Sequence, residues 1–205
     1  MFFSERKSNM TSLYEIRNVR YGYRWDHQIN LVLKGVSFSI PTRCFACLVG
    51  PSGSGKTSLL NLMGFLDRPD EGRILFGGTD VGYLQESQRE RLRLRDIGFV
   101  FQGFHLLPTL TVFENTAYFL SRLGIGPKEA RDLSESVLRR VGLLHAFRKR
   151  PRELSGGECQ RVAIARALVK NPRVILADEP TAHLDPHTAE EIIDTFKNLY
   201  HNYGV

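Results

Sequence analysis

The sequence predicts an α/β fold with a largely parallel sheet, and three observations carry this prediction. Short apolar runs typical of strands alternate with helical patterns along most of the 205 residues. One such run leads through a glycine-rich loop directly into a helix, and another ends in two adjacent acidic residues. A content of 42% hydrophobic and 24% charged residues is enough to bury a core. We therefore expect a single domain over residues 1–205.

Five apolar runs predict strands because they are short, rich in β-branched or aromatic residues, and bounded by turn residues. They cover residues 36–40, 44–49, 74–76, 97–101 and 174–177. Between residues 109 and 152, apolar residues instead recur at helical spacing, which predicts a helical insertion. A last helix is expected to begin at Asp185 and Pro186 and to stop at Gly204.

Cysteine usage and charge exclude some classes of protein. Three cysteines are too few for a disulfide framework. Cys44 and Cys47 match C-x-x-C, but residues three apart on a strand face opposite sides, so we expect buried thiols rather than a redox or metal pair. The formal net charge of +6 would suit nucleic acid, anionic lipid or a phosphate ligand, although the basic residues are mostly scattered. The opening MFFSERKSNM is too charged for a signal peptide, and no long apolar run follows, so we expect a cytoplasmic chain.

The segment GPSGSGKTS matches the phosphate-binding pattern G-x-x-x-x-G-K-[ST] between a predicted strand and a predicted helix. Its glycines let successive backbone N–H groups point at an anion, and the helix adds its positive dipole end. Lys56 would reach the β- and γ-phosphates, and the Thr57 hydroxyl would bind Mg²⁺. The predicted nucleotide-binding residues are Gly50, Pro51, Ser52, Gly53, Ser54, Gly55, Lys56, Thr57 and Ser58. The alternative is a glycine-rich turn followed by an incidental Lys-Thr pair.

The run RVILADEPT is an apolar strand that ends in two acids. Asp178 is placed to hold Mg²⁺ through water, and Glu179 could polarise a water for attack on the γ-phosphate. Neighbouring side chains on a strand point different ways, which allows the two roles to be separate. The alternative is a solvated strand end, which the presence of a phosphate loop makes less favourable.

The run LSGGECQR can be explained first by local structure. Ser155 followed three residues later by Glu158 predicts a capping box at the start of an apolar helix, and this needs no ligand. However, Gly156 and Gly157 would also expose unpaired N–H groups at the helix start, which is a second surface suited to phosphate.

These motifs, in this order, resemble the ATP-binding cassette family, whose signature is LSGGQ or LSGGE, and the resemblance covers essentially the whole chain. It implies a P-loop NTPase core with an N-terminal antiparallel β part and a helical subdomain at about residues 103–153. It also implies a homodimer in which ATP and Mg²⁺ lie between the phosphate loop of one copy and Ser155, Gly156 and Gly157 of the other. Two departures from the family pattern are Ala182, usually glycine, and Cys159, usually glutamine.

The resemblance also assigns roles to residues outside the three motifs. Gln102 matches the family's glutamine loop, which contacts Mg²⁺ and links ATP to the helical subdomain. Tyr23 matches the aromatic residue that stacks on adenine, with Tyr21 and Trp25 as alternatives. The stretches IGFVFQ, HLLP, LTVFEN and LADEPT look most like ATPases of lipoprotein-releasing, macrolide-exporting and cell-division-type transporters. This implies an ATPase, with Glu179, Gln102 and Lys56 as catalytic residues, attached to the inner face of the membrane through a transmembrane permease subunit.

Family members continue beyond the last predicted helix into a central strand and a switch histidine, and this sequence stops before them. His183, His187 and His201 do not replace that histidine, because none follows an apolar strand. We therefore expect a shortened chain in which the strands at residues 44–49 and 174–177 lose a ladder partner. One alternative function is thus an ATP-binding module with weak or no hydrolysis. Another is a non-transport ATPase that acts on nucleic acid, supported only by the basic charge, and we expect no nucleic-acid partner.

Overall fold

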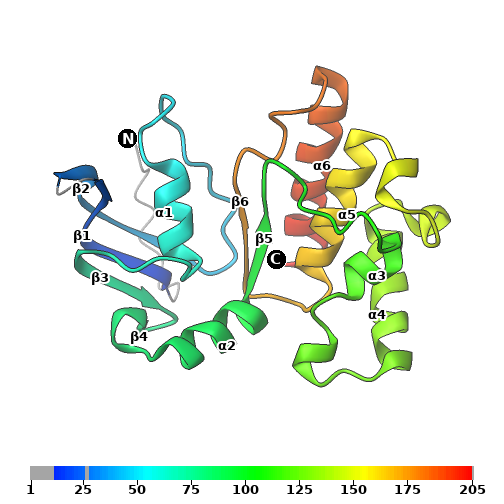
Figure 1. The fold of residues 1–205 in the computed structure, drawn as a ribbon, viewed down its shortest axis with the longest axis horizontal. Helices are drawn as coiled ribbons and strands as arrows, with labels where there is room; N and C mark the ends of the chain where they lie inside the picture. Colours follow the sequence, from blue (N-terminus) through cyan, green and yellow to red (C-terminus); the bar gives the residue numbers. More distant parts are fainter. Residues whose placement is uncertain (1–11, 26–27, 205) are drawn as a thin grey trace. The chain divides into compact units, whose positions relative to one another are not determined.

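The computed structural model describes residues 12–25 and 28–204, which form parts of two compact units, residues 1–90 and residues 91–205 (Figure 1). The charged opening segment, the side chain of Trp25 and the terminal Val205 lie outside what the structure describes. Among the described residues, no helix combines the length and the apolar composition that crossing a bilayer requires.

The first unit is built on a four-stranded antiparallel sheet with the strand order β2-β1-β3-β4. Its strands are β1 (Ser12–Trp25), β2 (Gln28–Pro41), β3 (Glu71–Phe76) and β4 (Thr79–Asp80), and they confirm the expected antiparallel part and the strands predicted at 36–40 and 74–76. Helix α1 (Lys56–Met63) belongs to this unit. Tyr14 of β1 contacts both the sheet and the helix. Its ring centre lies 5.0 Å from that of Phe76 in β3, and its hydroxyl donates to the carbonyl of Met63 in α1 at 2.8 Å.

The strand predicted at residues 44–49 is absent, so that prediction is wrong. The segment has no regular secondary structure, and Val49 is 87% exposed. Cys44 and Cys47 are exposed as well, which also makes the prediction of buried thiols wrong. The physical reason is pairing: a strand is stabilised by a ladder to a neighbour, and no described strand pairs with this segment.

The second unit contains a parallel pair of strands, β5 (Ile97–Val100) and β6 (Val174–Ala177), close to the predicted runs. Val100 lies opposite Ala177, and one further hydrogen bond, from Asp178 N–H to the Val100 carbonyl at 2.9 Å, continues the ladder. Helix α5 (Gly156–Leu168) packs on β5 at Gly98, where an added Cβ would lie 2.8 Å from the Ala167 carbonyl oxygen. A side chain at position 98 would therefore push the helix away from the strand.

The segment predicted to be helical, residues 109–152, lies in the second unit and contains helices. Its helices are α3 (Val112–Ala117) and α4 (Pro127–Arg140), with the short 3-10 turns η2 (Ser121–Leu123), η3 (Leu144–Ala146) and η4 (Pro151–Glu153). Buried Asn115 holds the preceding loop by accepting from the Leu107 N–H at 2.8 Å and donating to three carbonyls, including that of Leu110 at 3.0 Å. The remaining elements are η1 (Val81–Tyr83) and α2 (Glu86–Asp96), which contains the boundary between the units.

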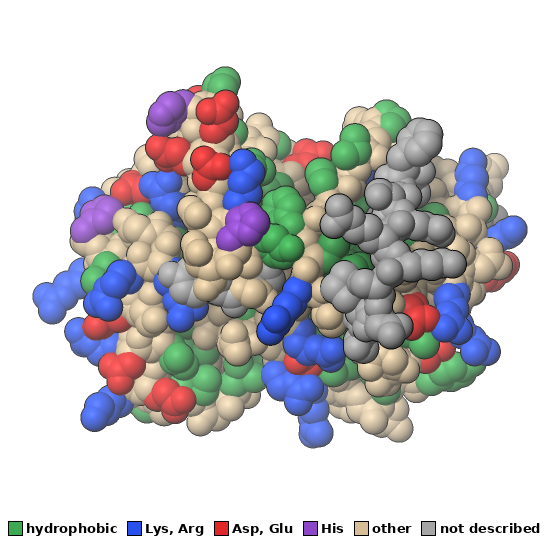
Figure 2. Space-filling model, turned by 180° about the vertical axis from the view of Figure 1, so that it is seen from behind, with side chains coloured by type: hydrophobic (Ala, Val, Ile, Leu, Met, Phe, Trp, Pro, Cys, Tyr) green, Lys and Arg blue, Asp and Glu red, His purple; other side chains and the backbone are tan. Residues whose placement is uncertain are grey.

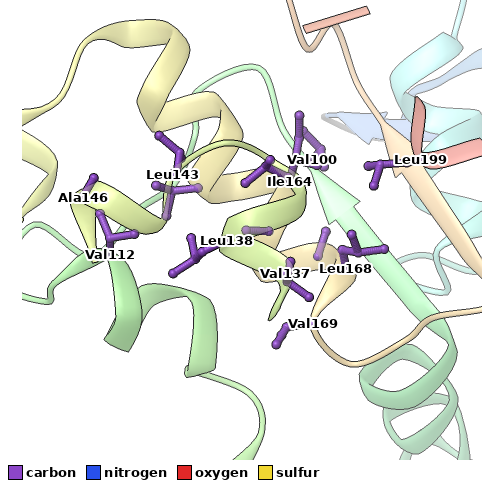
Figure 3. Packing of buried hydrophobic residues seen from close by; sticks show 14 of the residues in the cluster. Val100, Val112, Val137, Leu138, Leu143, Ala146, Ile164, Leu168, Val169 and Leu199 are labelled. Carbon is purple, nitrogen blue, oxygen red and sulfur yellow. The ribbon is translucent and has the colours of Figure 1, made fainter. Parts of the chain in front are cut away.

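One apolar core joins the insertion to the strand pair (Figure 3). Leu138 and Leu143, at and after the end of α4, share this cluster with Val100 of β5 and Ile164 of α5, and all four side chains are buried. Apolar burial of this kind contributes about 25 cal/mol for each Å² removed from water. The insertion is therefore packed onto the framework that carries β5 and β6.

Helix α6 (Pro186–Tyr203) ends this unit with both predicted caps in place. Asp185 accepts a hydrogen bond from the Thr188 N–H at 3.1 Å, and Gly204 closes the helix with a φ of 67°. Ile192 and Leu199 of α6 are buried in the same apolar cluster. The prediction of this helix and of its two ends is confirmed.

Lys170, just after α5, is the most strongly perturbed basic group described. Its Nζ donates to the Arg93 carbonyl at 3.1 Å and lies 5.7 Å from the centre of the Phe119 ring. Burial lowers the pKa of Lys170 from 10.5 to about 8, partly offset by the negative charge of Asp96. Between these two values the unfolded chain binds more protons at this position than the folded chain does, so stability rises with pH across that window.

We predict that Lys170→Met removes this gain in stability. The free energy of unfolding, measured by urea denaturation, should increase between about pH 8 and about pH 10.5 in the wild-type chain and increase less in the variant. Lys197→Met is the control, since Lys197 is an exposed lysine of α6 and should leave the pH dependence unchanged. An identical pH dependence in wild type and Lys170→Met would contradict the prediction.

Candidate functional site

The glycine-rich loop before α1 has the backbone that the sequence predicts. Gly53 and Gly55 adopt φ values of 76° and 90°, in the left-handed region that favours glycine. Position 55 also leaves no room for a side chain. An added Cβ would lie 2.8 Å from the side chain of Val32 and 2.9 Å from that of Leu33. Glycine at position 55 therefore serves both the turn and the close approach to β2.

Lys56 folds back over this loop. Its Nζ donates to the carbonyls of Gly50 and Pro51, both at 2.9 Å, so the ammonium lies across the turn. Helix α1 has no side-chain cap at its N-terminus and no acidic residue in its first turn, so its positive end has no anionic partner within that turn. A turn of exposed residues, a helix N-terminus and an ammonium group together suit a phosphate ligand.

Tyr23 stands beside the loop helix. Its hydroxyl and that of Ser58 are 2.9 Å apart, and the tyrosine side chain is 48% exposed. Ser58 itself is buried, so its hydroxyl serves this contact, whereas Thr57 is exposed. Tyr21 meets Tyr23 edge to face at 5.3 Å, and burial, with Asp67 and the other neighbours adding to it, raises the pKa of Tyr21 to about 12. Of the two tyrosines, Tyr23 is therefore the more open ring next to α1.

In the second unit, the parallel pairing of β5 and β6 brings their carboxyl ends to one edge. Gln102 follows β5, and Asp178 and Glu179 follow β6. Glu179 is exposed and has a φ of 44°, a strained conformation for a residue with a side chain and one that is frequent at functional sites. His183 also reaches Gln102 at this edge, a contact that sequence reasoning missed because it depends on pairing between segments 81 residues apart.

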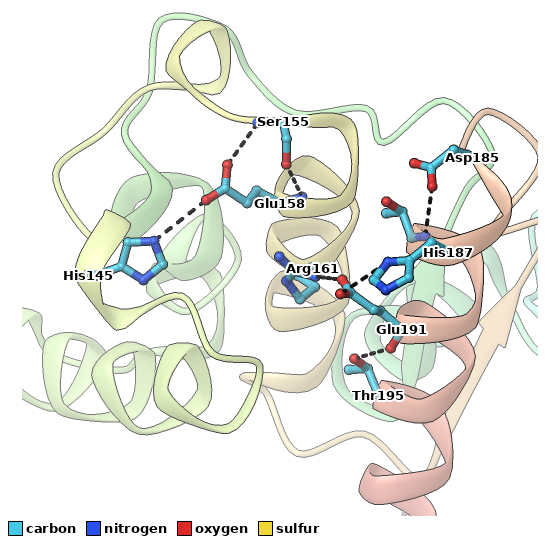
Figure 4. Close-up of polar contacts among 9 residues, drawn as sticks. His145, Ser155, Glu158, Arg161, Asp185, His187, Glu191 and Thr195 are labelled. Atoms are coloured by element: carbon cyan, nitrogen blue, oxygen red, sulfur yellow. Dashed lines mark hydrogen bonds and ion pairs between the residues drawn. The ribbon is translucent and has the colours of Figure 1, made fainter.

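The predicted capping box of α5 is formed (Figure 4). The Ser155 hydroxyl accepts from the Glu158 N–H at 3.2 Å, and the Glu158 carboxylate accepts from the Ser155 N–H at 2.8 Å. The hydrogen bond from the Ser155 backbone is the main cause that lowers the pKa of Glu158. The His145 ring lies 3.5 Å from the same carboxylate. The local explanation of Ser155, a helix cap, is therefore confirmed.

Gly156 and Gly157 lie against the segment that leads into α6. An added Cβ at Gly157 would meet the Thr188 methyl group at 2.4 Å, and one at Gly156 would meet the Leu184 side chain at 3.3 Å. Close packing on α6 is thus one reason for glycine at position 157, independent of any ligand. Figure 4 shows a second contact between α5 and α6, the ion pair of Arg161 and Glu191 at 3.2 Å.

The residues predicted to bind Mg²⁺ have the right donor chemistry for that ion. Thr57 offers a hydroxyl, Gln102 an amide oxygen and Asp178 a carboxylate, and oxygen atoms are the ligands that Mg²⁺ prefers. Thr57 belongs to the first unit, and the other two belong to the second. Within the described part of the chain, no group of three or more His, Cys, Asp or Glu side chains forms a metal site by itself.

A protein-family model described as ABC transporter matches residues 33–182, most of the chain and all three motifs. The chain belongs to the ABC transporter family. It is 44% identical over 195 residues to the macrolide export ATP-binding/permease protein MacB of Syntrophobacter fumaroxidans, an alignment that covers 94% of this chain and 27% of that protein. It is 43% identical over 196 residues to the lipoprotein-releasing system ATP-binding protein LolD of Geobacter metallireducens, covering 96% of this chain and 87% of that one. The chain thus spans about a quarter of the first relative and most of the second.

A solved structure supports the same assignment. The ATP-binding cassette MJ0796, in a dimeric post-hydrolysis state bound to ADP and Pi, aligns with a TM-score of 0.84 at 38% identity, covering 93% of this chain and 84% of that chain. The expected fold class, an ABC ATPase fold with an antiparallel part, a parallel sheet and helices, is confirmed. Within this ABC transporter domain, the ligand roles of the individual residues stay predictions.

The contact of Gly157 with Thr188 yields a prediction about packing. Gly157→Ala should destabilise the chain by about 1 to 3 kcal/mol, the typical cost of overfilling a packed interface. Thr188→Ser removes the methyl group that the new Cβ would meet, so the double variant should recover much of that loss. Urea denaturation of the wild type, both single variants and the double variant measures the coupling. Additive effects would show that the packing of Gly157 on Thr188 does not require glycine.

Proposed function

We propose that this chain binds ATP with Mg²⁺ and hydrolyses it as the nucleotide-binding domain of a membrane transporter. The observation that carries the proposal is the loop from Gly50 to Gly55, which has left-handed glycines, the Lys56 ammonium lying across it and an uncapped helix N-terminus. This combination provides backbone N–H groups and positive charge for a triphosphate.

The proposed roles follow from the chemistry of each group. Lys56 binds the β- and γ-phosphates, and the Tyr23 ring, next to α1, stacks on adenine. Thr57, Gln102 and Asp178 supply oxygen ligands for Mg²⁺, which when bound neutralises charge on the phosphates. Glu179 accepts the proton of the water that attacks the γ-phosphate. Its exposed, strained position at the end of β6 supports this role.

A second copy of the chain is the proposed partner at the nucleotide. Ser155, Gly156 and Gly157 of that copy would close over the phosphates with the N-terminus of α5. The dimeric state of MJ0796 supports this arrangement. The capping box is compatible with it, because the Ser155 hydroxyl is bound to only one N–H group and keeps further hydrogen-bonding capacity.

A transmembrane permease is the second proposed partner, and it would hold the chain at the inner face of the membrane. Support comes from the relatives: one is an ATP-binding/permease protein, and another is the ATP-binding protein of a lipoprotein-releasing system. The helical insertion shares its core with β5, so motion of the segment after β5 can be passed to the insertion. Nucleic-acid binding is not favoured, because the basic residues are mostly scattered along the sequence, and acidic side chains also appear on the face in Figure 2.

The proposal predicts that substitutions of different residues affect ATP binding and ATP hydrolysis separately. Lys56→Ala should lower the affinity for ATP by at least about tenfold, because charged contacts to phosphate are strong. Glu179→Gln should leave the affinity within about threefold but reduce phosphate release by at least about a hundredfold, as expected for loss of a general base. Fluorescence titration with an ATP analogue and steady-state phosphate release provide the two measurements.

Two further outcomes decide among the alternatives. Wild-type binding without phosphate release would favour the ATP-binding module with weak or no hydrolysis. An absence of magnesium-dependent ATP binding in the folded wild-type chain would contradict the proposal altogether. Lys197→Ala, at an exposed ion pair on α6, is the matched control for loss of a lysine and should change neither measurement.

A further inference from the structure

His183 contacts Gln102 through both nitrogens of its ring. Its Nδ1 lies 3.3 Å from the backbone carbonyl oxygen of Gln102, and its Nε2 lies 3.3 Å from the side-chain nitrogen Nε2 of Gln102. Both residues belong to the second unit, in the segments that follow β6 and β5. A single ring therefore holds the backbone and the side chain of the same glutamine.

The partners on Gln102 determine which ring tautomer satisfies both contacts. A carbonyl oxygen can only accept, so Nδ1 must carry the hydrogen and donate it. An amide nitrogen can only donate, so the ring Nε2 must be the unprotonated acceptor. The two contacts are thus satisfied together by the tautomer that carries hydrogen on Nδ1 and a lone pair on Nε2.

The contact also fixes the orientation of the Gln102 side-chain amide. Its NH₂ group faces the imidazole, so its oxygen Oε1, on the opposite side of the amide carbon, is left free of the ring. Oε1 is the only atom of this side chain that can bind a cation. Without the ring, the amide could turn about its last bond and present either atom.

The loop that carries Gln102 is held in place by other contacts. Phe104 and His105 have left-handed φ values of 54° and 48°, and the Arg166 guanidinium donates to both of their carbonyls, at 2.8 Å for Phe104. The loop of His183 has its own turn, with a hydrogen bond from the Leu184 N–H to the Thr181 carbonyl at 3.2 Å. These contacts constrain the backbone of both loops, so the freedom left to Gln102 lies mainly in its side chain.

We propose that His183 is a positioning residue that turns the Gln102 amide so that its oxygen is presented to Mg²⁺. This inference rests on the proposed function, because it assumes that Gln102 binds the magnesium of bound nucleotide. His183 itself touches neither nucleotide nor metal in this proposal. It acts through the acceptor at its Nε2, and the Nδ1 hydrogen bond places that acceptor.

Substitutions at position 183 separate the two contacts. Glutamine can place its amide oxygen, an acceptor, near the position of the ring Nε2. Asparagine is shorter, so its amide can reach only the position of Nδ1. Alanine supplies neither. His187, an exposed histidine of α6 paired with Glu191, offers a matched control because its ring belongs to a different contact.

The first test uses the nucleotide-free chain. Nuclear magnetic resonance of histidine labelled with ¹⁵N reports which ring nitrogen carries hydrogen, and the signal lost in His183→Gln identifies position 183. We expect the tautomer with hydrogen on Nδ1 in the wild type. In Gln102→Ala the backbone carbonyl remains and still requires hydrogen on Nδ1, so the ring should keep this tautomer, whereas its Nε2 signal should shift because the contact with the side-chain amide is lost. A wild-type ring protonated mainly on Nε2 would overturn the proposal.

The second test measures the gain in ATP affinity that Mg²⁺ provides. His183→Ala and His183→Asn should reduce this gain about fivefold, the effect of one hydrogen bond of ordinary strength. His183→Gln should restore most of it, and His187→Ala should leave it unchanged. ATP affinity without Mg²⁺ should be the same in all variants. In a Gln102→Ala background, His183→Ala should have no further effect, because the two residues act as one unit.

The outcomes distinguish the two proposals. If Mg²⁺ improved ATP affinity in the wild type and His183→Ala kept the whole gain, the role of His183 would be wrong and the proposed function would stand. If the folded wild-type chain bound no ATP, the proposed function would be wrong, and the role of His183 would fail with it. Circular dichroism of each variant shows whether a loss of affinity reflects a loss of folding.

Discussion

The parallel pairing of β5 and β6 is the constraint on which the second unit depends. Val100 lies opposite Ala177, and the Asp178 N–H donates to the Val100 carbonyl. The carboxyl ends of both strands therefore lie side by side. Gln102 then lies at the same edge as the two acids and the loop of His183. Gln102 and His183 are 81 residues apart in the chain. A shift of one residue in this register would turn every side chain of one strand to the other face. The register therefore decides which chemical groups can cooperate.

Close backbone contacts transmit this constraint to the helices. α5 approaches β5 over Gly98, and α6 approaches the start of α5 over Gly157, where no side chain would fit without displacement. Arg166 of α5 in turn donates to the strained residues Phe104 and His105 that follow Gln102. The glutamine loop, the capped start of α5 and the loop before α6 are thus parts of one packed framework. If a ligand displaced one of these segments, the other two would either oppose the displacement or move with it.

Sequence reasoning succeeded where structure is determined locally. The glycine-rich turn, the capping box at Ser155 and both ends of α6 depend on residues within a few positions of one another, and all are present. The strand at residues 44–49 was predicted from the same kind of local pattern and is absent, because strand formation also requires a distant partner. The contacts of His183 and Arg166 were not predicted for the same reason. Glycine at position 157 was interpreted only as a ligand contact, although its packing on Thr188 is visible only in the fold.

The phosphate loop keeps its form without a flanking strand because its contacts are local to the first unit. Gly55 fits against Val32 and Leu33, Lys56 bonds to the loop carbonyls, and the two ends of α1 are held through Tyr23 and Tyr14. Of the groups proposed for hydrolysis, Gln102 and Glu179 belong instead to the second unit, and they depend on the β5–β6 register. The local contacts of the phosphate loop in the first unit and the strand register in the second unit are thus two separate physical requirements.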